Sequence, residues 1–316
     1  MASTPENRKT RQAVATAYGE PEQVIEVIEI PTPTPGPGEA LITVEAIGAN
    51  PFDTKTIRGV FGADEEQLPR HPGLELAGVI TEFGSPADGF AVGDHVIAYP
   101  APGAFADHVV VSTSALHPRP AELSPEIGAG LLLAGVTAAD AVRTAEIGGD
   151  DVVVVHGGAG AVGVIVVQLA ITAGATVIAT AAEANHDHLR SLGAIPIRYG
   201  EGLLDRIREA APGPVTRAID AAGTDEAIDV SLQLLPAAAV VSVAAFGRGS
   251  DGIVIVDGST PESRRHRAEA AADLIAAAAS GSLVIEVAAR YPLAQAGVAL
   301  SELGRTHQRG KFIVIP

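Results

Sequence analysis

The sequence predicts an α/β protein in which a doubly wound parallel sheet follows a barrel-like, β-rich domain. Three observations support this fold class. Before residue 124, short apolar runs are separated by Gly, Pro and Asp, as in small β barrels. After it, strand and helix patterns alternate, as in parallel sheets. Between one such strand and helix stands the glycine-rich segment GGAGAVG. The 316 residues suffice for roughly two domains.

The first region carries the strand patterns of the β-rich domain. Apolar residues alternate or cluster between turn residues in six runs, which we expect to be strands: 13–18, 24–30, 40–49, 74–83, 95–99 and 104–111. The segment Pro31–Glu39 is rich in proline, which removes backbone donors and fixes φ. We therefore expect that segment to be an extended connection rather than a helix or a central strand.

The second region begins with a helix-start signal at Ser124, where Ser can cap and Pro125 stands at the first helical position. Six strands are expected to form the parallel sheet: 151–156, 176–180, 195–197, 216–220, 239–244 and 252–256. Helices are expected between them at 162–172, 184–192, 203–210 and 224–234, followed by one at 267–278. A strand at 282–287, a helix at 292–302 and a strand at 311–315 complete the chain. The predicted domains are 1–123, 124–281, and a return to the first domain over 282–316.

Composition excludes several classes of protein. The chain has no cysteine, which rules out disulfides, thiolate-bound zinc, iron–sulfur clusters and a catalytic thiol. It carries 21 Lys and Arg against 38 Asp and Glu, a net charge of −17, which argues against a nucleic-acid partner. Its apolar runs are shorter than the roughly 20 residues of a membrane span. Its polar N-terminus does not resemble a signal peptide. We therefore expect a cytoplasmic protein with no membrane partner.

The segment GGAGAVG carries the cofactor prediction. Gly158, Gly160 and Gly163 fit the pattern GxGxxG, between a predicted strand and a predicted helix. The glycines permit a tight turn, close approach to a pyrophosphate and close helix packing. Amide groups at the helix start, near Ala161 and Val162, can bind phosphate. The alternative is a glycine-rich turn before a buried helix. We interpret the second region as a Rossmann dinucleotide-binding domain.

The end of the second predicted strand bears on the choice of cofactor. An acidic residue there favours NAD, but this strand ends in Ala181-Ala182, which favours NADP. Glu183, one position later, keeps NAD open as an alternative. Polar side chains nearby are candidate partners of a 2′-phosphate: Thr180, Asn185, His186, Arg190 and Arg198. His186 is equally explained as the solvated start of a helix.

Segments throughout the chain from about Gln12 resemble one superfamily. They are Gly48–Lys55, His71–Ile80, Val92–Tyr99, Gly103–Val111, Ala134–Val142, Gly157–Gly163, His186–Ala194, Ala218–Gly223 and Arg309–Pro316. In this order they resemble the medium-chain dehydrogenase/reductase superfamily, and within it the zinc-independent, zeta-crystallin-like quinone oxidoreductases. The resemblance implies that the first domain is GroES-like and catalytic, and that the protein is a homodimer.

The resemblance also bears on zinc. Zinc-dependent relatives place a cysteine near Asn50–Asp53 and Gly-His-Glu near Gly73. Here the residues are Asn50-Pro51 and Gly73-Leu74-Glu75, so metal ligands are missing. Glu75 is then expected to be a buried or hydrogen-bonded carboxylate, and no metal is expected. Without zinc to activate an alcohol, the resemblance implies NADPH-dependent reduction of a quinone or an α,β-unsaturated carbonyl.

Three residues are candidates for catalysis, each with an alternative. Asn50 could donate from its amide to the substrate carbonyl or the nicotinamide ribose, or be a turn residue before Pro51. Lys55 stands where many relatives have Tyr, and could act as an electrostatic or proton donor or be an exposed lysine. Tyr99 lines the pocket by resemblance, or is an ordinary strand aromatic. Asp53 is expected to cap the following turn or helix.

Further cofactor contacts follow from the resemblance. Thr137 is expected near the nicotinamide and Tyr199 beside the adenosine 2′-phosphate. Ala245, Phe246 and Gly247 follow the fifth strand, at the edge of the sheet where cofactors bind. Arg309 and Lys311 lie in a segment that closes over the cofactor, although Lys311 could instead be a surface lysine.

Two other functions fit the same sequence. The chain could bind NADPH without turnover, as a sensor or scaffold protein, since Lys55 departs from the family pattern. It could also be a pathway-specific tailoring reductase of a specialised metabolite. The run GIVIVDG of the sixth predicted strand is an apolar edge, which supports pairing with a second copy.

Overall fold

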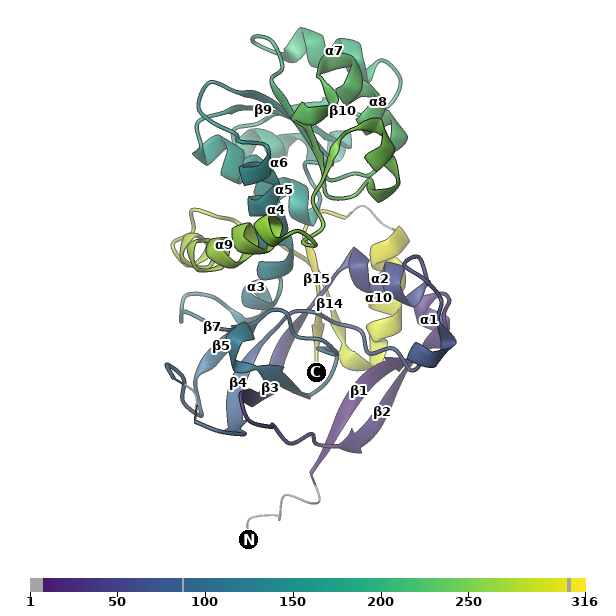
Figure 1. Ribbon diagram of the computed structural model, residues 1–316, viewed down its shortest axis with the longest axis vertical. Helices are drawn as coiled ribbons and strands as arrows, with labels where there is room; N and C mark the ends of the chain where they lie inside the picture. The colour runs from purple at the N-terminus through teal and green to yellow at the C-terminus, as the bar shows by residue number, and fades with distance from the viewer. Residues whose placement is uncertain (1–7, 87, 306–307) are drawn as a thin grey trace. The chain divides into compact units, whose positions relative to one another are not determined.

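The structure is a computed structural model that describes residues 8–86, 88–305 and 308–316 (Figure 1). Most of the polar N-terminal segment considered above lies outside these residues. The chain divides into two compact units. One contains the described residues up to Leu133 together with Ile275–Pro316, and the other is Ala134–Leu274. The domain boundaries expected at 123/124 and 281/282 stay predictions. No helix in the described part is long and apolar enough to cross a lipid bilayer.

The second unit is built on a parallel sheet. Its six strands are β8 (Val152–His156), β9 (Thr176–Ala181), β10 (Ile195–Arg198), β11 (Arg217–Asp220), β12 (Val240–Ser242) and β13 (Val254–Ile255). They are arranged in the order β10-β9-β8-β11-β12-β13, and every neighbouring pair is parallel. The chain leaves the central strand β8 first toward one edge and then toward the other, so the doubly wound sheet is confirmed.

Helices connect these strands or flank them along the chain. They are α4 (Leu132–Thr144), α5 (Ala161–Thr172), α6 (His186–Ser191), α7 (Leu203–Ala210), α8 (Asp225–Leu234) and α9 (Pro261–Ala279), with short 3₁₀ turns η4 (Glu183–Asn185), η5 (Ala237–Ala239) and η6 (Phe246–Asp251). Helix α5 is apolar almost throughout and largely buried, as expected for a helix packed on the sheet. Helix α9 begins earlier than expected, because Pro261 suits a first helical turn and the Thr260 hydroxyl accepts from the Ser263 amide.

The first unit is dominated by antiparallel strands. Strands β1 (Lys9–Ala15) and β2 (Ile25–Pro31) form a separate pair. The larger sheet contains β3 (Glu39–Ala49), β4 (Leu76–Phe83), β5 (His95–Ala98), β6 (His108–Ser112), β7 (Leu116–Pro118), β14 (Val287–Pro292) and β15 (Lys311–Ile315). The order is β14-β15-β3-β4-β5-β7, with β6 also paired to β3. The C-terminal strands therefore lie in the N-terminal sheet, as the predicted return of the chain requires.

Short helices complete the first unit. They are α1 (Pro21–Val24), α2 (Pro51–Ile57), α3 (Pro125–Ala129) and α10 (Ala296–Arg305), with 3₁₀ turns η2 (Glu65–Gln67), η3 (Thr113–Ala115) and η7 (Leu293–Gln295). The core between sheet and helices includes the fully buried rings of Phe105 and Phe312. Burial of such apolar surface is the main stabilising contribution in a chain without disulfides.

One expected strand is wrong. The strand expected at 282–287 is irregular, and β14 begins only at Val287. Leu283 and Ile285 are buried, which explains the apolar alternation, but they pack without a strand partner. Gly281, with φ of +77°, follows the end of α9 and redirects the chain there. The strand expected at 13–18 is also shifted, since β1 spans Lys9–Ala15.

Candidate functional site

The loop between β8 and α5 has the geometry that a pyrophosphate requires. Gly157 has φ of +72°, which turns the chain directly after β8. A Cβ on Gly163 would lie 2.1 Å from the Gly157 carbonyl oxygen, so only glycine lets α5 pack this closely against the loop. Gly160 precedes the first turn of α5 and is exposed. The first amides of a helix have no partner within it, so this helix start is suited to bind phosphate oxygens.

A chain of hydrogen bonds supports the start of this loop. The Thr180 hydroxyl oxygen accepts from the Gly157 amide at 3.2 Å and lies 3.4 Å from Nδ1 of His156. The other ring nitrogen of His156 lies 3.1 Å from Ser231 Oγ, which donates its own proton to the Ala227 carbonyl. His156 must therefore donate from Nε2 and accept at Nδ1. Burial lowers the pKa of His156 to about 4, which keeps the ring neutral.

This arrangement changes the role expected for Thr180. The sequence suggested that its hydroxyl contacts a 2′-phosphate. The structure places Thr180 at 2% exposure, with the hydroxyl directed toward Gly157 and His156. Because β9 is an interior strand, a side chain near its end can be buried even where the strand tip is accessible. Thr180 supports the glycine-rich loop instead.

The loops after β11 and β12 are fixed by a second buried network. Asp220 accepts from the amides of Ala222 and Gly223 at 2.9 Å. Ser242 Oγ donates to Asp220 at 2.7 Å and accepts from the Ala245 amide at 2.9 Å. Ala245 is consequently buried, whereas the next residues, Phe246 and Gly247, are exposed at the carboxyl end of the sheet. Their predicted contact with the cofactor stays a prediction.

The ends of β9 and β10 lie next to each other. Arg198 pairs with Ala181 in the parallel ladder, so Tyr199 follows β10 at the edge of the sheet where β9 also ends. Tyr199 is 48% exposed.

The remaining residues of this group differ in their surroundings. His186 is half-buried, with Nε2 3.4 Å from the Ala181 carbonyl oxygen. Arg190 is paired with Asp187 at 2.6 Å on the surface. Thr137, on α4, is half-buried in the same unit. Their cofactor contacts stay predictions.

In the first unit, four polar side chains form a buried cluster: Asn50, Asp53, Glu75 and Lys311, all at 3% exposure or less. The Lys311 ammonium donates to Asn50 Oδ1 at 2.5 Å and to Glu75 Oε1 at 2.9 Å. The other Glu75 oxygen accepts from the Leu133 amide at 2.9 Å. The expectation that Glu75 is a buried, hydrogen-bonded carboxylate is confirmed. Lys311 is neither a surface lysine nor accessible, because Glu75 and Asn50 surround its charge.

The cluster also fixes the orientation of Asn50. Its Nδ2 donates to the Gly48 carbonyl at 3.1 Å and to Glu75 Oε1 at 3.0 Å, while its Oδ1 faces the Lys311 ammonium. An amide has two N–H donors, and both are used here. The expected donation from Asn50 to a substrate carbonyl would require one of these buried bonds to break. The structure therefore supports a positioning role for Asn50.

Asp53 caps helix α2, as expected. Its Oδ2 accepts from the Asn50 amide at 3.0 Å and its Oδ1 accepts from the Gly73 amide at 2.9 Å. These bonds hold the start of α2 against the turn that precedes Glu75. Burial raises the pKa of Asp53 to about 7, so this carboxyl is partly protonated at neutral pH.

Two other candidates lie at the surface of the first unit. Lys55 is half-buried on α2, and Tyr99, directly after β5, is half-buried as well. Arg309 is ion-paired with Glu286. Arg309 thus has an ion-pair partner within the first unit. The contact predicted between Arg309 and a cofactor stays a prediction.

An exposed aromatic pair was not anticipated. The rings of Phe52 and Phe61 stack with centroids 5.3 Å apart, at 45% and 52% exposure. Val60 beside them is 61% exposed. Phe52 precedes Lys55 by three positions on α2, which places the two side chains on the same face of the helix. Large exposed apolar side chains gathered in one place indicate a binding surface.

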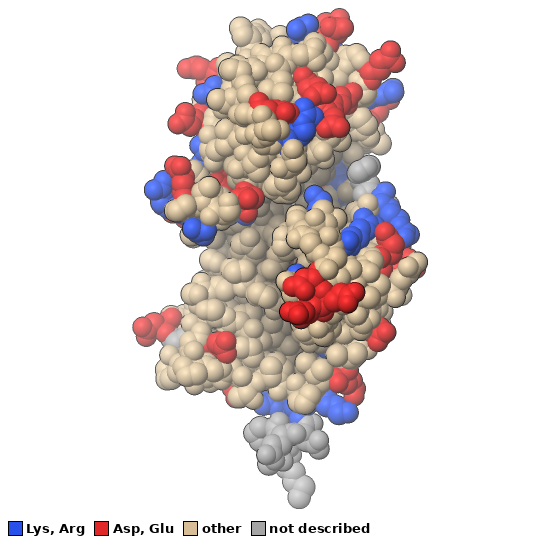
Figure 2. All heavy atoms as spheres, turned by 45° about the vertical axis from the view of Figure 1, so that its right-hand side comes forward, with Lys and Arg blue, Asp and Glu red and all other residues tan. Residues whose placement is uncertain are grey.

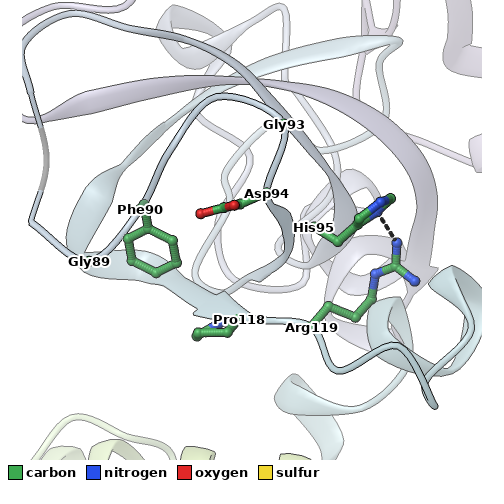
Figure 3. Close-up of a pocket in the computed structure, with 7 residues that line it drawn as sticks. All are labelled: Gly89, Phe90, Gly93, Asp94, His95, Pro118 and Arg119. Atoms are coloured by element: carbon green, nitrogen blue, oxygen red, sulfur yellow. Dashed lines mark hydrogen bonds between the residues drawn. The ribbon is translucent and has the colours of Figure 1, made fainter.

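The first unit also contains a hollow of about 360 Å³ away from these residues. Its walls come from the chain leading into β5, from the start of β5 and from the end of β7: Gly89, Phe90, Gly93, Asp94, His95, Pro118 and Arg119. Figure 3 shows the Asp94 carboxylate and the Phe90 ring on one side, and the hydrogen-bonded pair of His95 and Arg119, 2.7 Å apart, on the other. None of the candidate catalytic or cofactor residues is among the residues that line it.

Glu75 has no neighbouring set of metal ligands in the part of the chain that the structure describes. Among the described residues, no group of three or more His, Cys, Asp or Glu is placed to hold a metal. Glu75, the one residue shared with the zinc motif, already accepts bonds from Asn50, Lys311 and Leu133. A metal would have to displace a buried ammonium from this carboxylate.

Comparison with known proteins agrees with these features. Residues 36–121 match the alcohol dehydrogenase GroES-like domain, and residues 161–265 match the domain described as zinc-binding dehydrogenase. A quinone oxidoreductase from Pseudomonas aeruginosa is 30% identical over 95% of this chain and 98% of its own length. An NADPH-dependent alkenal/one oxidoreductase from Arabidopsis thaliana is 27% identical over 100% of this chain and 81% of its own.

Solved structures show the same fold. A mycobacterial protein in complex with NADPH has a TM-score of 0.85 at 28% identity, over 97% of this chain and 100% of that one. A GroES-like domain combined with a parallel dinucleotide-type sheet defines the class of the medium-chain dehydrogenases and reductases. The chain belongs to the medium-chain dehydrogenase/reductase superfamily, among the quinone oxidoreductases. The resemblance identified from the sequence is thus confirmed.

Proposed function

We propose that this protein is a zinc-independent oxidoreductase that uses NADPH to reduce quinones or α,β-unsaturated carbonyl compounds. The loop between β8 and α5 is the observation that carries the proposal. Its close approach of Gly163 to Gly157 and its exposed Gly160 suit a dinucleotide pyrophosphate. Relatives named as quinone oxidoreductase and as NADPH-dependent alkenal/one oxidoreductase support the reaction class.

In this proposal the residues of the second unit bind and orient the cofactor. The amides at Gly160, Ala161 and Val162 hold the pyrophosphate, and the adenosine end lies beside Tyr199. Thr137, Asn185, His186 and the segment Ala245–Gly247 are proposed as further contacts. NADPH, when bound, supplies a hydride to an electron-poor carbon of the acceptor.

The acceptor is proposed to meet the first unit at the exposed end of α2. Phe52 and Phe61 offer an apolar face to a ring or alkene, and Tyr99 is proposed as a further lining residue. Lys55 is proposed to stabilise negative charge that develops on the acceptor oxygen. Asn50 is proposed as a positioning residue, since its amide is used within the buried cluster.

Zinc independence is part of the proposal. The Lys311 ammonium neutralises Glu75. The acceptors proposed are already electrophilic, so no metal is needed to activate an alcohol. We further propose that the protein is cytoplasmic and forms a homodimer, in which the edge strand β13 pairs with a second copy. Gel filtration of the purified chain and cell fractionation test these two points.

Consumption of NADPH tests the proposed activity directly. The purified protein is incubated with NADPH and a panel of quinones, enals and enones, and loss of NADPH absorbance is followed. We expect turnover with at least one acceptor class, and unchanged turnover after dialysis against a zinc chelator. Tight NADPH binding with no turnover across the whole panel would instead support a sensor or scaffold protein. Loss of activity on chelation would contradict zinc independence.

A further inference from the structure

The loop that carries Tyr199 is held by one arginine from helix α7. The Arg206 Nε donates to the Arg198 carbonyl at 3.1 Å, and Nη2 donates to the same oxygen at 2.8 Å. Nη2 also donates to the Gly200 carbonyl at 2.9 Å, and Nη1 donates to the Glu201 carbonyl at 2.7 Å. A single guanidinium therefore binds the backbone on both sides of Tyr199. Only a planar fork with several donors can do this.

The backbone of this loop needs such support. Gly200 and Gly202 have φ of +98° and +79°, so the chain makes two sharp turns within three residues. The Gly200 amide donates to Glu226 Oε2 at 3.1 Å, from helix α8. Arg206 thus donates to the carbonyls of the loop, and Glu226 accepts from its Gly200 amide. Between these two anchors the Tyr199 side chain remains 48% exposed.

Arg206 also places positive charge at this loop. All its hydrogen bonds within the described part of the chain go to backbone carbonyls, and none goes to a carboxylate. The other charged groups at the loop are the exposed Arg198 and Glu201 and the half-buried Glu226. The loop is therefore balanced in charge, in a chain of net charge −17. Figure 2 shows carboxylates at many places on the face of the molecule in view.

The loop after β10 lies at the edge of the sheet where the adenosine end of a dinucleotide is expected. In the sheet, Arg198 of β10 pairs with Ala181 of β9, so Tyr199 follows where β9 ends. In dinucleotide-binding sheets, the end of this strand faces the adenosine ribose and decides between NAD and NADP. The chain has no acidic residue at that tip, and it has a clamped loop beside it.

We propose that Arg206 is the positioning residue that makes the site selective for a 2′-phosphate. It fixes the loop Arg198–Gly202 in the one conformation that presents Tyr199 to the adenosine end, and it keeps this loop from carrying a net negative charge. The inference rests on the proposed use of NADPH, and it adds which residue of this chain determines that preference. Arg206 acts through the loop and is not itself assigned a contact with the ligand.

Binding of two cofactor fragments and two whole cofactors to the full chain tests the proposal. Calorimetry compares 2′,5′-ADP with 5′-AMP, and NADPH with NADH, for the wild type, Arg206→Met and Arg206→Lys. We expect both variants to raise the Kd for 2′,5′-ADP and NADPH about tenfold, because neither methionine nor lysine can hold all three loop carbonyls and Tyr199 is no longer kept in place. The Kd for 5′-AMP and NADH should change by less than about threefold, because these ligands lack the 2′-phosphate.

A matched control uses the next arginine of the same helix. Arg208 is exposed and lies 3.9 Å from Asp205, away from the loop backbone. Arg208→Met removes the same charge, and we expect it to leave all four Kd values unchanged.

Each outcome decides a separate point. If wild-type protein binds neither NADPH nor 2′,5′-ADP, the proposed use of NADPH fails. If it binds both and the Arg206 variants keep the wild-type ratio of NADPH to NADH affinity, the role of Arg206 is overturned while the proposed function stands. If neither variant folds, as judged by circular dichroism, Arg206 is a structural residue and the specificity role is likewise overturned.

Discussion

The Lys311 ammonium lies 2.9 Å from a Glu75 carboxylate oxygen, and both side chains are buried, at 4% exposure or less. The pair joins β15, at the C-terminus, to the turn before β4. Asn50 bonds to both members and so connects them to the start of α2. A full positive and a full negative charge are thus enclosed in the first unit. Such pairs depend on both partners, because either charge alone is costly to bury.

Removal of one partner should therefore destabilise the protein strongly. Lys311→Met leaves the Glu75 carboxylate buried without a cation, and we expect a loss of about 3–5 kcal/mol in the free energy of unfolding. Urea denaturation measures it. The double variant Lys311→Met, Glu75→Gln removes both charges and should recover part of this loss.

An exposed pair provides the control. Lys9 and Glu29 lie 3.0 Å apart with side chains 66% and 62% exposed. Lys9→Met should change stability by less than about 1 kcal/mol, since solvent screens this pair. Equal effects of the two single substitutions would contradict the buried role of Lys311.

The glycine-rich loop gives a second prediction. In Gly163→Ala the new Cβ would lie 2.1 Å from the Gly157 carbonyl oxygen, so α5 and the loop must separate. We expect the melting temperature to fall and the Kd for NADPH to rise at least about tenfold. Gly213→Ala is the control, because a Cβ there has no heavy atom within 4 Å and the backbone has no positive φ. NADPH binding that is unchanged in Gly163→Ala would contradict the placement of the pyrophosphate.

The support of this loop by Thr180 can be tested separately. Thr180→Val removes the acceptor of the Gly157 amide and the donor to His156, without a large change of volume. We expect weaker binding of NADPH and NADH by the same factor, because the loop serves the pyrophosphate that both share. Thr180→Ser keeps the hydroxyl and should restore binding. A selective effect on NADPH would mean that Thr180 contacts the 2′-phosphate after all.

The buried carboxyl of Asp53 predicts a pH dependence. Its pKa rises from an ordinary 3.8 to about 7. Between these two pH values, the folded state keeps a proton on Asp53 that the unfolded state has released. Its contribution to stability is complete below 3.8 and is lost as the pH rises through 7. His156 acts oppositely, because its pKa falls from 6.5 to about 4, and its contribution is lost as the pH falls through that range.

The substitution Asp53→Asn isolates the contribution of Asp53 to the pH dependence of stability. The variant cannot ionise, so its stability relative to wild type should increase between about pH 5 and about pH 8. Urea denaturation of both proteins at the two pH values measures this difference. Any lost hydrogen bond in the variant contributes equally at both values and cancels. A relative stability that is independent of pH would show that Asp53 ionises normally.

The parallel sheet and its glycine-rich loop could be predicted from sequence, because both depend on local patterns. The apolar run of β8 and the GxGxxG spacing occur within adjacent residues. The pairing of Lys311 with Glu75 could not be predicted, since 236 positions separate them and no motif relates a C-terminal lysine to that turn. Arg206 was missed for a related reason. Its partners are backbone carbonyls, which leave no signal in side-chain chemistry.

The exposed stack of Phe52 and Phe61 predicts that the KM of a large acceptor depends on Phe61 more than the KM of a small one. If this pair forms the apolar face of the acceptor site, Phe61→Ala should raise KM for a bicyclic quinone by about tenfold, the loss expected when one aromatic contact is removed. It should change KM for a three-carbon enal by less than about twofold, because so small a molecule buries little surface. The Kd for NADPH should stay the same. Val92→Ala removes a side chain that is 62% exposed in the same unit, outside the stack, and should alter neither KM. Equal losses for both acceptors would point to a structural role for Phe61, and no loss for either would place the acceptor elsewhere.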